Sequence, residues 1–151
     1  MPTRRLPLVA ALIASGLALS GCSVVDGLLG GGNNVFTLEV GDCVNDASIG
    51  DEAVTSVPVV DCTEPHDSEI FYSHIMTQSE YPGTTATTDE ADAACSSAFE
   101  DFVGIPYSDS VLYFSYFYPT ETTWSDGDRE VLCLVYDADT QTTGSLAGAA
   151  R

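Results

Sequence analysis

The sequence predicts an α+β domain, a small antiparallel sheet with one main helix, stapled by two disulfides. Three observations support this prediction. Short segments rich in β-forming residues recur between residues 36 and 136, one stretch repeats its apolar residues at helical spacing, and four cysteines follow Cys22 in a chain with an export signal. Residues 36–148 are expected to form the domain, and its length of about 110 residues allows a real but small core.

The early part of the domain contains three segments with strand character. Residues 36–40 alternate apolar and polar side chains and end at a Gly-Asp turn. Residues 57–61 resume this character, and Pro58 moves them toward a sheet edge. Residues 68–75 are rich in β-formers and are expected to form a central strand. Strict alternation would put three of its side chains on one face: Ile70, Tyr72 and His74.

One helix is predicted after residues 77–86, which are rich in Thr, Ser, Pro and Gly. Thr87 and Glu90 have the spacing of a capping box, so we expect the helix to begin at Thr87. Gly104 and Pro106 should end it. The residues expected to face the core recur at three- and four-residue intervals: Ala91, Ala94, Cys95, Ala98, Phe99 and Phe102.

Two further strands are predicted in the last third of the chain. Residues 111–118 are rich in aromatic side chains and stop at Pro119. Residues 125–128 carry a turn signal, and residues 130–136 return to strand character. One face of that last strand holds Val131, Cys133 and Val135. The tail from Asp137 is small and polar, so at most partial order is expected there.

The first residues have the order of a bacterial lipoprotein signal. Arg4 and Arg5 precede an apolar run, and Leu19-Ser20-Gly21-Cys22 resembles the lipobox, in which the cysteine receives a diacylglyceryl group, the leader is cut off before it, and the new amine is often acylated. Residues 1–21 are therefore expected to be a signal peptide and Cys22 the site of lipid attachment. The alternative is an uncleaved anchor, because the apolar stretch is only slightly shorter than the ~20 residues of a spanning helix.

The segment after the lipid site, residues 22–35, is rich in glycine and poor in apolar side chains. We expect it to be a flexible tether that lets the domain sample roughly 20 Å from the bilayer. The expected location of the chain is the extracytoplasmic face of the cell membrane.

The chain is strongly acidic. It has four Arg, no Lys and 23 acidic residues, and loss of the leader, which holds two Arg and no acid, takes the formal net charge from −19 to −21. Nucleic acid is excluded as a partner, because its phosphates need basic side chains. Adhesion to anionic lipid headgroups is excluded for the same reason, so membrane attachment should rest on the lipid. The simplest explanation of the acidity is solubility together with the amino-acid composition typical of a GC-rich or salt-exposed organism. The alternative is that the acidic groups bind a basic partner or divalent cations.

The four cysteines after Cys22 are predicted to form two disulfides, because an exported chain meets an oxidising environment. Three pairings are possible. We favour Cys43 with Cys62, which lie in neighbouring strand-like segments, and Cys95 with Cys133, which would tie the helix to a late strand. Each bridge should contribute ~3–4 kcal/mol in the chain-entropy treatment.

No catalytic residue is predicted. His66 and His74 are the only imidazoles, and no serine lies in a Gly-x-Ser-x-Gly elbow. The spacing of Cys62, His66 and His74 suggests a metal site, but oxidised export argues against it, so no metal or cofactor is expected. His66 follows a proline and precedes an aspartate, which suits an imidazole that closes a turn through hydrogen bonds to backbone or carboxylate groups.

Residues 124–128 superficially resemble a calcium loop. They lack the alternate ligands and the distal bidentate glutamate of an EF-hand. We expect a hairpin turn instead, with Trp124 covering the sheet and Arg129 pairing with a nearby acid.

Taken in order, these features resemble the actinobacterial septum formation domain over about residues 36–148. The resemblance rests on the ordered cysteines and on two elements around them, Cys62-x-x-Pro65-His66 and Trp124-x-x-Gly127-Asp128-Arg129. It implies an extracytoplasmic, disulfide-bonded, non-enzymatic domain linked by name to division septa. Two hypotheses follow: a membrane-anchored interaction module that binds an envelope or division protein or a wall component, and a wall-active hydrolase that uses carboxylates of the acidic domain.

Overall fold

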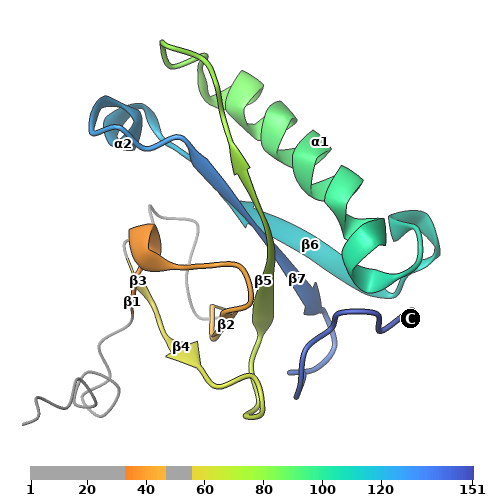
Figure 1. The fold of residues 1–151 in the computed structure, drawn as a ribbon. Coiled ribbons are helices and arrows are strands. Elements are labelled where there is room, and N and C mark those ends of the chain that lie inside the picture. Colours follow the sequence, from red (N-terminus) through yellow and green to blue (C-terminus); the bar gives the residue numbers. More distant parts are fainter. Residues whose placement is uncertain (1–32, 47–55) are drawn as a thin grey trace, which may run out of the picture.

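The computed structural model of the chain, drawn in Figure 1, describes residues 33–46 and 56–151. The predicted signal peptide, Cys22 and all but the last three residues of the predicted tether lie outside these ranges. Within them, no helix combines the length and the apolar character needed to cross a membrane.

A five-stranded antiparallel sheet forms the centre of the domain, in the order β4-β2-β5-β7-β6. Its strands are β2 (Cys43–Val44), β4 (Val59–Val60), β5 (Ser68–Ile75), β6 (Leu112–Phe117) and β7 (Glu130–Asp137). The main helix, α1 (Thr84–Val103), crosses one face of this sheet, and the N-terminal segment lies on the other (Figure 1). The α+β class is therefore confirmed, as are both favoured disulfides, Cys43–Cys62 and Cys95–Cys133.

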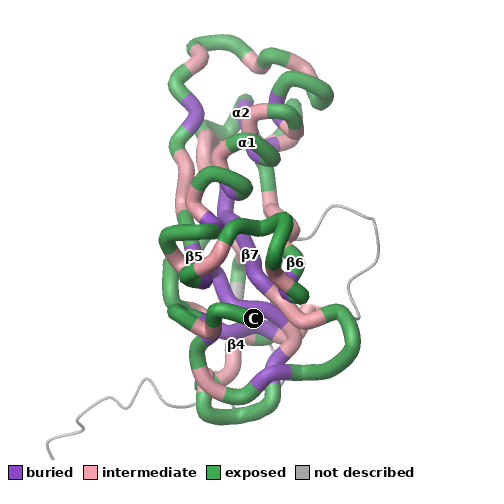
Figure 2. Tube along the Cα trace, turned by 90° about the vertical axis from the view of Figure 1, so that its right-hand side faces the viewer, coloured by how far each residue is buried: buried purple, intermediate pink, exposed green. Residues whose placement is uncertain are grey.

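Successive side chains of β7 point to opposite faces of the sheet, and apolar residues at both sets of positions explain why both faces are covered. Val131, Cys133 and Val135 face α1, as predicted, while Leu132 and Leu134 face the N-terminal segment. Buried positions accordingly run along β7 in Figure 2. The core on the α1 side is the larger one and contains Ala91, Cys95, Phe99 and Val103 of the helix. The opposite core is closed by Leu38, Val44 and Val57.

Shorter elements complete the fold. A two-stranded ribbon pairs β1 (Asn33–Asn34) with β3 (Ser56–Val57), and η2 (Val35–Thr37) and η3 (Tyr107–Asp109) are single 3₁₀ turns. The short helix α2 (Glu121–Ser125) precedes β7.

The predicted strand at residues 36–40 is wrong. Asn34 caps η2 by accepting a hydrogen bond from the Phe36 amide, and Asp42 accepts one from the Glu39 amide. These local side-chain hydrogen bonds satisfy backbone amides that would otherwise pair with a neighbouring strand. Only Leu38 of this segment is buried. The segment around Pro58 is split into β3 and β4, which belong to different sheets, and β4 is an edge strand as expected.

The central strand β5 has the predicted bounds but contains a bulge between Ile70 and Tyr72. The inserted residue, Phe71, packs in the core on the α1 side, against Phe99 and Phe102. Ile70 therefore faces the opposite core, and the prediction that it shares a face with Tyr72 and His74 is wrong.

Helix α1 ends at Gly104 in the left-handed conformation, as predicted, but it begins three residues earlier than the capping-box spacing suggested. Gly83 is its N-cap, with φ 91°, a value that glycine adopts without strain. Thr87 lies inside the helix, fully buried, and its hydroxyl donates to the Gly83 carbonyl at 3.0 Å.

The C-terminal tail is ordered along its length, which corrects the expectation of partial order. Leu146 is buried in the core on the α1 side. The amides of Gly148 and Ala150 donate to the carbonyls of Phe102 and Val103 at the end of α1. The tail therefore closes the end of the helix, where carbonyl groups otherwise lack partners.

Candidate functional site

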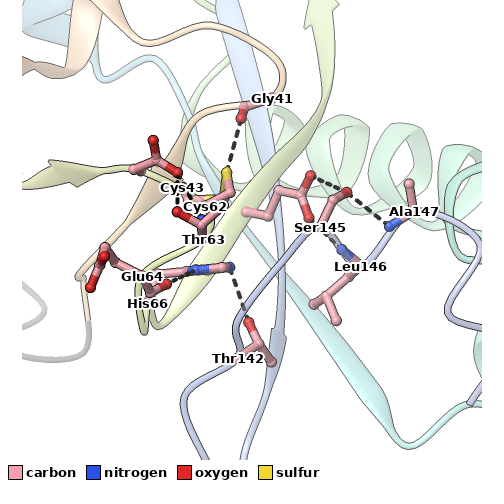
Figure 3. Close-up of a disulfide and its surroundings, with 12 residues drawn as sticks. Gly41, Cys43, Cys62, Thr63, Glu64, His66, Thr142, Ser145, Leu146 and Ala147 are labelled. Atoms are coloured by element: carbon pink, nitrogen blue, oxygen red, sulfur yellow. Dashed lines mark hydrogen bonds between the residues drawn. A yellow bond between two sulfur atoms is a disulfide. The ribbon is translucent and has the colours of Figure 1, made fainter.

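Two buried polar side chains, His66 and Glu69, lie at a junction between the Cys43–Cys62 bridge and the C-terminal tail (Figure 3). His66 is completely buried there. Its Nδ1 lies 2.9 Å from the Glu64 carbonyl, and its Nε2 lies 3.1 Å from the Thr142 hydroxyl. Because a carbonyl only accepts, Nδ1 carries the proton and Nε2 accepts from Thr142. Both ring nitrogens are thus engaged in holding the fold.

Glu69 is the second buried polar group of this junction, and the sequence did not single it out. One carboxylate oxygen accepts from the Ser145 hydroxyl and the other from the Leu146 amide, both at 2.7 Å. The side chain is 3 % exposed. Its partners lie 76 and 77 residues away in sequence, so only its position amid apolar β-formers could have drawn attention to it.

Within residues 33–46 and 56–151, Arg129 forms no ion pair with an acid and instead contacts a ring and backbone carbonyls. The guanidinium carbon lies 3.7 Å from the centroid of the Trp124 ring, and Nη1 donates to the carbonyls of Trp124 and Asp128. Trp124 belongs to α2, where Thr120 and Thr123 form a capping box, so a helical turn stands where a simple hairpin was expected. Tyr81 also packs against Trp124, with the two ring centroids 5.7 Å apart. Arg129 therefore stabilises the turn by stacking.

An acidic groove of about 490 Å³ lies on the sheet face opposite α1. Four aspartates line it, together with hydroxyl, amide and aromatic side chains: Asp46, Asp67, Ser68, Ser115, Tyr136, Asp137, Ala138, Asp139, Thr140 and Gln141. Asp46 accepts from the Ser68 hydroxyl at 2.8 Å, and the Gln141 amide donates to Asp67 at 2.9 Å. Burial raises the pKa of Asp46 above its ordinary value of 3.8, and the nearby charge of Asp67 raises it further.

Replacing Asp46 by asparagine should stabilise the protein at neutral pH. Because the folded state raises the pKa of Asp46, ionising this group costs stability as the pH rises from 3.8 toward the folded value, and the loss persists above it. Asparagine keeps an oxygen for Ser68 and carries no charge. We expect a gain of up to about 1 kcal/mol in unfolding free energy at pH 7, vanishing near about pH 3. Urea unfolding at both pH values measures it, with Asp139→Asn, an exposed residue of the same groove, as control. A loss at pH 7 for Asp46→Asn would contradict the account.

A second groove, of about 440 Å³, lies between β5 and α1. We call it the His74 groove, and its lining is Tyr72, His74, Glu90, Ala93, Ala94, Ser97, Ala98 and Asp101. His74 Nε2 lies 2.8 Å from Glu90 Oε1, and Gln78 donates to Glu90 Oε2 at 2.6 Å. The hydrogen bond from His74 is the main cause that lowers the pKa of Glu90, and Gln78 adds to it. Sequence reasoning missed this pair, because its partners come from different elements.

The predicted site residues thus fall in three places. His66 and the Cys43–Cys62 bridge lie at the tail junction, Trp124 and Arg129 form the α2 corner, and Cys95–Cys133 crosses the core. In residues 33–46 and 56–151, no group of three His, Cys, Asp or Glu side chains is arranged to hold a metal ion. Cys22 lies outside the described ranges.

Comparison with known proteins gives one match. The sequence pattern of a family described as Septum formation matches residues 38–151, which is most of the chain. No curated protein and no solved structure matches it. The matched residues include both disulfides, the tail junction and both grooves.

Proposed function

Because this chain belongs to the Septum formation family, we propose that it is a lipid-anchored envelope protein whose domain acts as a non-enzymatic interaction module in septum formation or cell division. The observation that carries this proposal is that the potentially reactive groups are used to hold the fold, while the accessible polar groups are mostly carboxylates. The groups with reactive potential, His66 and the four domain cysteines, hold the fold together. The open surface presents acidic grooves.

The charge of this surface indicates the chemistry of the partner. Arg129 and Arg151 are the only basic residues after residue 5. Arg129 stacks on Trp124, and Arg151 pairs with Asp137 at 2.9 Å, so neither offsets the remaining carboxylates. A partner with basic side chains would relieve their mutual repulsion and would be steered toward this surface. The proposed partner is therefore a basic segment of an envelope or division protein.

The competing proposal is a wall-active hydrolase. The His74 groove supports it to the extent that an imidazole and two carboxylates, Glu90 and Asp101, share one hollow. Against it, Glu90 already accepts hydrogen bonds from His74 and Gln78, and no residue that lines the groove is buried away from solvent. Digestion of purified wall material by the protein, abolished by Glu90→Gln and Asp101→Asn, would favour the hydrolase.

Localisation in dividing cells, combined with cross-linking, tests the interaction module. The full chain carrying a tag is compared with a control in which residues 1–35 carry an unrelated exported domain. We expect the full chain to gather at the septum and to cross-link to a division protein, and the control to spread evenly over the membrane. An even distribution of the full chain without a division partner, or septal signal from the control, would overturn the proposal.

A further inference from the structure

The central strand β5 has an open edge along its second half. Strand β2 covers only Ser68 and Glu69, and two further bonds join Ile70 to Gly41 and Asp42. Gly41 then turns the chain away at φ 100°. From Phe71 to Ile75, no strand of the described part of the chain pairs with β5 on that side. Such an edge is a template for another extended chain.

The backbone groups of this edge point outward at alternate residues. The Met76 amide donates to the Arg129 carbonyl at 2.9 Å, so Met76 directs its main chain toward β7. Because a strand repeats every two residues, Tyr72 and His74 also direct their N–H and C=O groups toward β7. Ser73 and Ile75 direct theirs toward the open edge. Ile75 is also 57 % exposed, which leaves an apolar contact beside these groups.

The His74 groove lies along the same edge, on the face covered by α1. Four of the six residues that α1 contributes to its lining are small, Ala93, Ala94, Ser97 and Ala98, and this explains the hollow between the helix and β5. An added strand would place every second side chain on this face, opposite Tyr72 and His74 and within about 5 Å of them. Those side chains would enter the groove.

The polar side chains of the groove, which include Glu90 and Asp101, offer hydrogen-bond acceptors. When the His74 ring is neutral and donates through Nε2 to Glu90, its Nδ1 is an acceptor, and Nδ1 has no partner in the described residues. Asp101 likewise makes no hydrogen bond or ion pair within residues 33–46 and 56–151. The exposed ring of Tyr72 adds a π-face. A lysine or arginine side chain matches all three features, since it is cationic, donates hydrogen bonds and favours aromatic faces.

We infer that the open edge of β5 binds an extended basic segment of a protein partner as an additional strand, with a lysine or arginine side chain in the His74 groove. This inference rests on the proposed function and names the surface that would carry it. Main-chain bonds to Ser73 and Ile75 give affinity, and the groove selects the cationic side chain. The outer edge of β6 is less suited, because on its α1 side Leu112 is buried and Phe114 packs against the core.

The test is the binding of a short fluorescent peptide of alternating lysine and threonine to the full-length chain in detergent. Its matched variants are Ser97→Arg, which places a long cation in the groove, and Ser96→Arg, which makes the same charge change at an exposed neighbouring site outside the groove. We expect Ser97→Arg to weaken binding by about tenfold or more and Ser96→Arg by about twofold at most. Urea unfolding establishes that both variants are as stable as the wild type.

A second peptide separates strand addition from simple charge attraction. It has the same sequence, with alternate backbone amides methylated so that they cannot donate to the edge. We expect it to bind about tenfold more weakly. Equal weakening by both arginine variants, unchanged binding of the methylated peptide, or no binding of the first peptide to the wild type would each overturn the inference.

The same Ser97→Arg variant in cells distinguishes this inference from the proposed function. If the wild type cross-links to a division protein and Ser97→Arg still does so, the β5 edge is the wrong surface and the interaction module stands. If the wild type cross-links to none, the module proposal fails, while the peptide titration still decides what the edge binds.

Discussion

Replacing Cys95 and Cys133 by alanine lowers the free energy of unfolding by about 4 kcal/mol, or more, because the bridge closes a loop with a sequence separation of 38 residues. A domain of this size has a total stability of about 5–15 kcal/mol. The variant is therefore expected to be barely folded at room temperature. Reducing agent acting on the wild type should have a similar effect.

The buried position of the Cys95–Cys133 bridge adds to the loss of unfolding free energy. Cys95 faces the sheet from the middle of α1, and Cys133 lies at the centre of β7. Both are completely buried in the same core as Ala91, Phe99 and Val131. Alanine at both positions removes the two sulfur atoms and leaves a cavity between helix and sheet, which carries its own penalty.

The matched control is removal of the other bridge, Cys43–Cys62. Its sequence separation is 19 residues, so the chain-entropy cost is about 3 kcal/mol, and it joins β2 to the turn that follows the edge strand β4. Urea unfolding followed by the fluorescence of Trp124, the single tryptophan, measures both variants on one scale. The account fails if the control loses more stability than the core pair, or if the core pair loses less than about 1 kcal/mol.

Much of this fold could be predicted, because short-range signals agreed with tertiary packing. The bounds of β5 followed from a run of β-formers, and Gly104 ended α1 as its position indicated. The disulfide pairing followed from which segments would be neighbours, so one correct placement of α1 against β7 also gave Cys95–Cys133.

The secondary-structure predictions failed where one local sequence pattern was compatible with two backbone conformations. Thr87 and Glu90 have the spacing of a capping box, but an additional turn of helix from Gly83 buries Thr87 against the sheet, and packing decided between the two. The bulge at Phe71 puts two consecutive aromatic side chains on the α1 face, which no two-residue period predicts.

The grooves depended on contacts that sequence does not reveal. Asp46 and Gln141 line one groove although they are separated by most of the domain, and His74 meets Glu90 only because α1 crosses β5. The tail was expected to be loose because it is small and polar, but Glu69 and His66 supply the partners that order it. Polar segments become ordered where buried groups satisfy their backbone.

Replacing Cys22 by alanine should abolish lipid attachment and leave the leader uncut. In the proposed lipoprotein the thiol of Cys22 carries a diacylglyceryl group, and cleavage before this residue follows that modification. The intact mass of the wild type is then that of residues 22–151 plus lipid. The mass of Cys22→Ala is expected to include residues 1–21 and no lipid. Intact mass distinguishes a lipidated chain from one with an uncut leader. Membrane partition does not, because an uncut apolar leader also holds a chain at the membrane.

Two features make this substitution more severe than loss of any domain cysteine. In the proposed lipoprotein the mature net charge of −21 would repel an anionic membrane, so attachment would rest on the lipid. Two acyl chains, with ~0.8 kcal/mol per buried methylene, suffice for stable anchoring where one chain is marginal. The control variant, with Cys43 and Cys62 both replaced by alanine, should keep the lipid and lose only stability. A wild-type mass that includes residues 1–21 without lipid would show instead that the leader is an uncleaved anchor, and Cys22 would then be an ordinary residue of the tether.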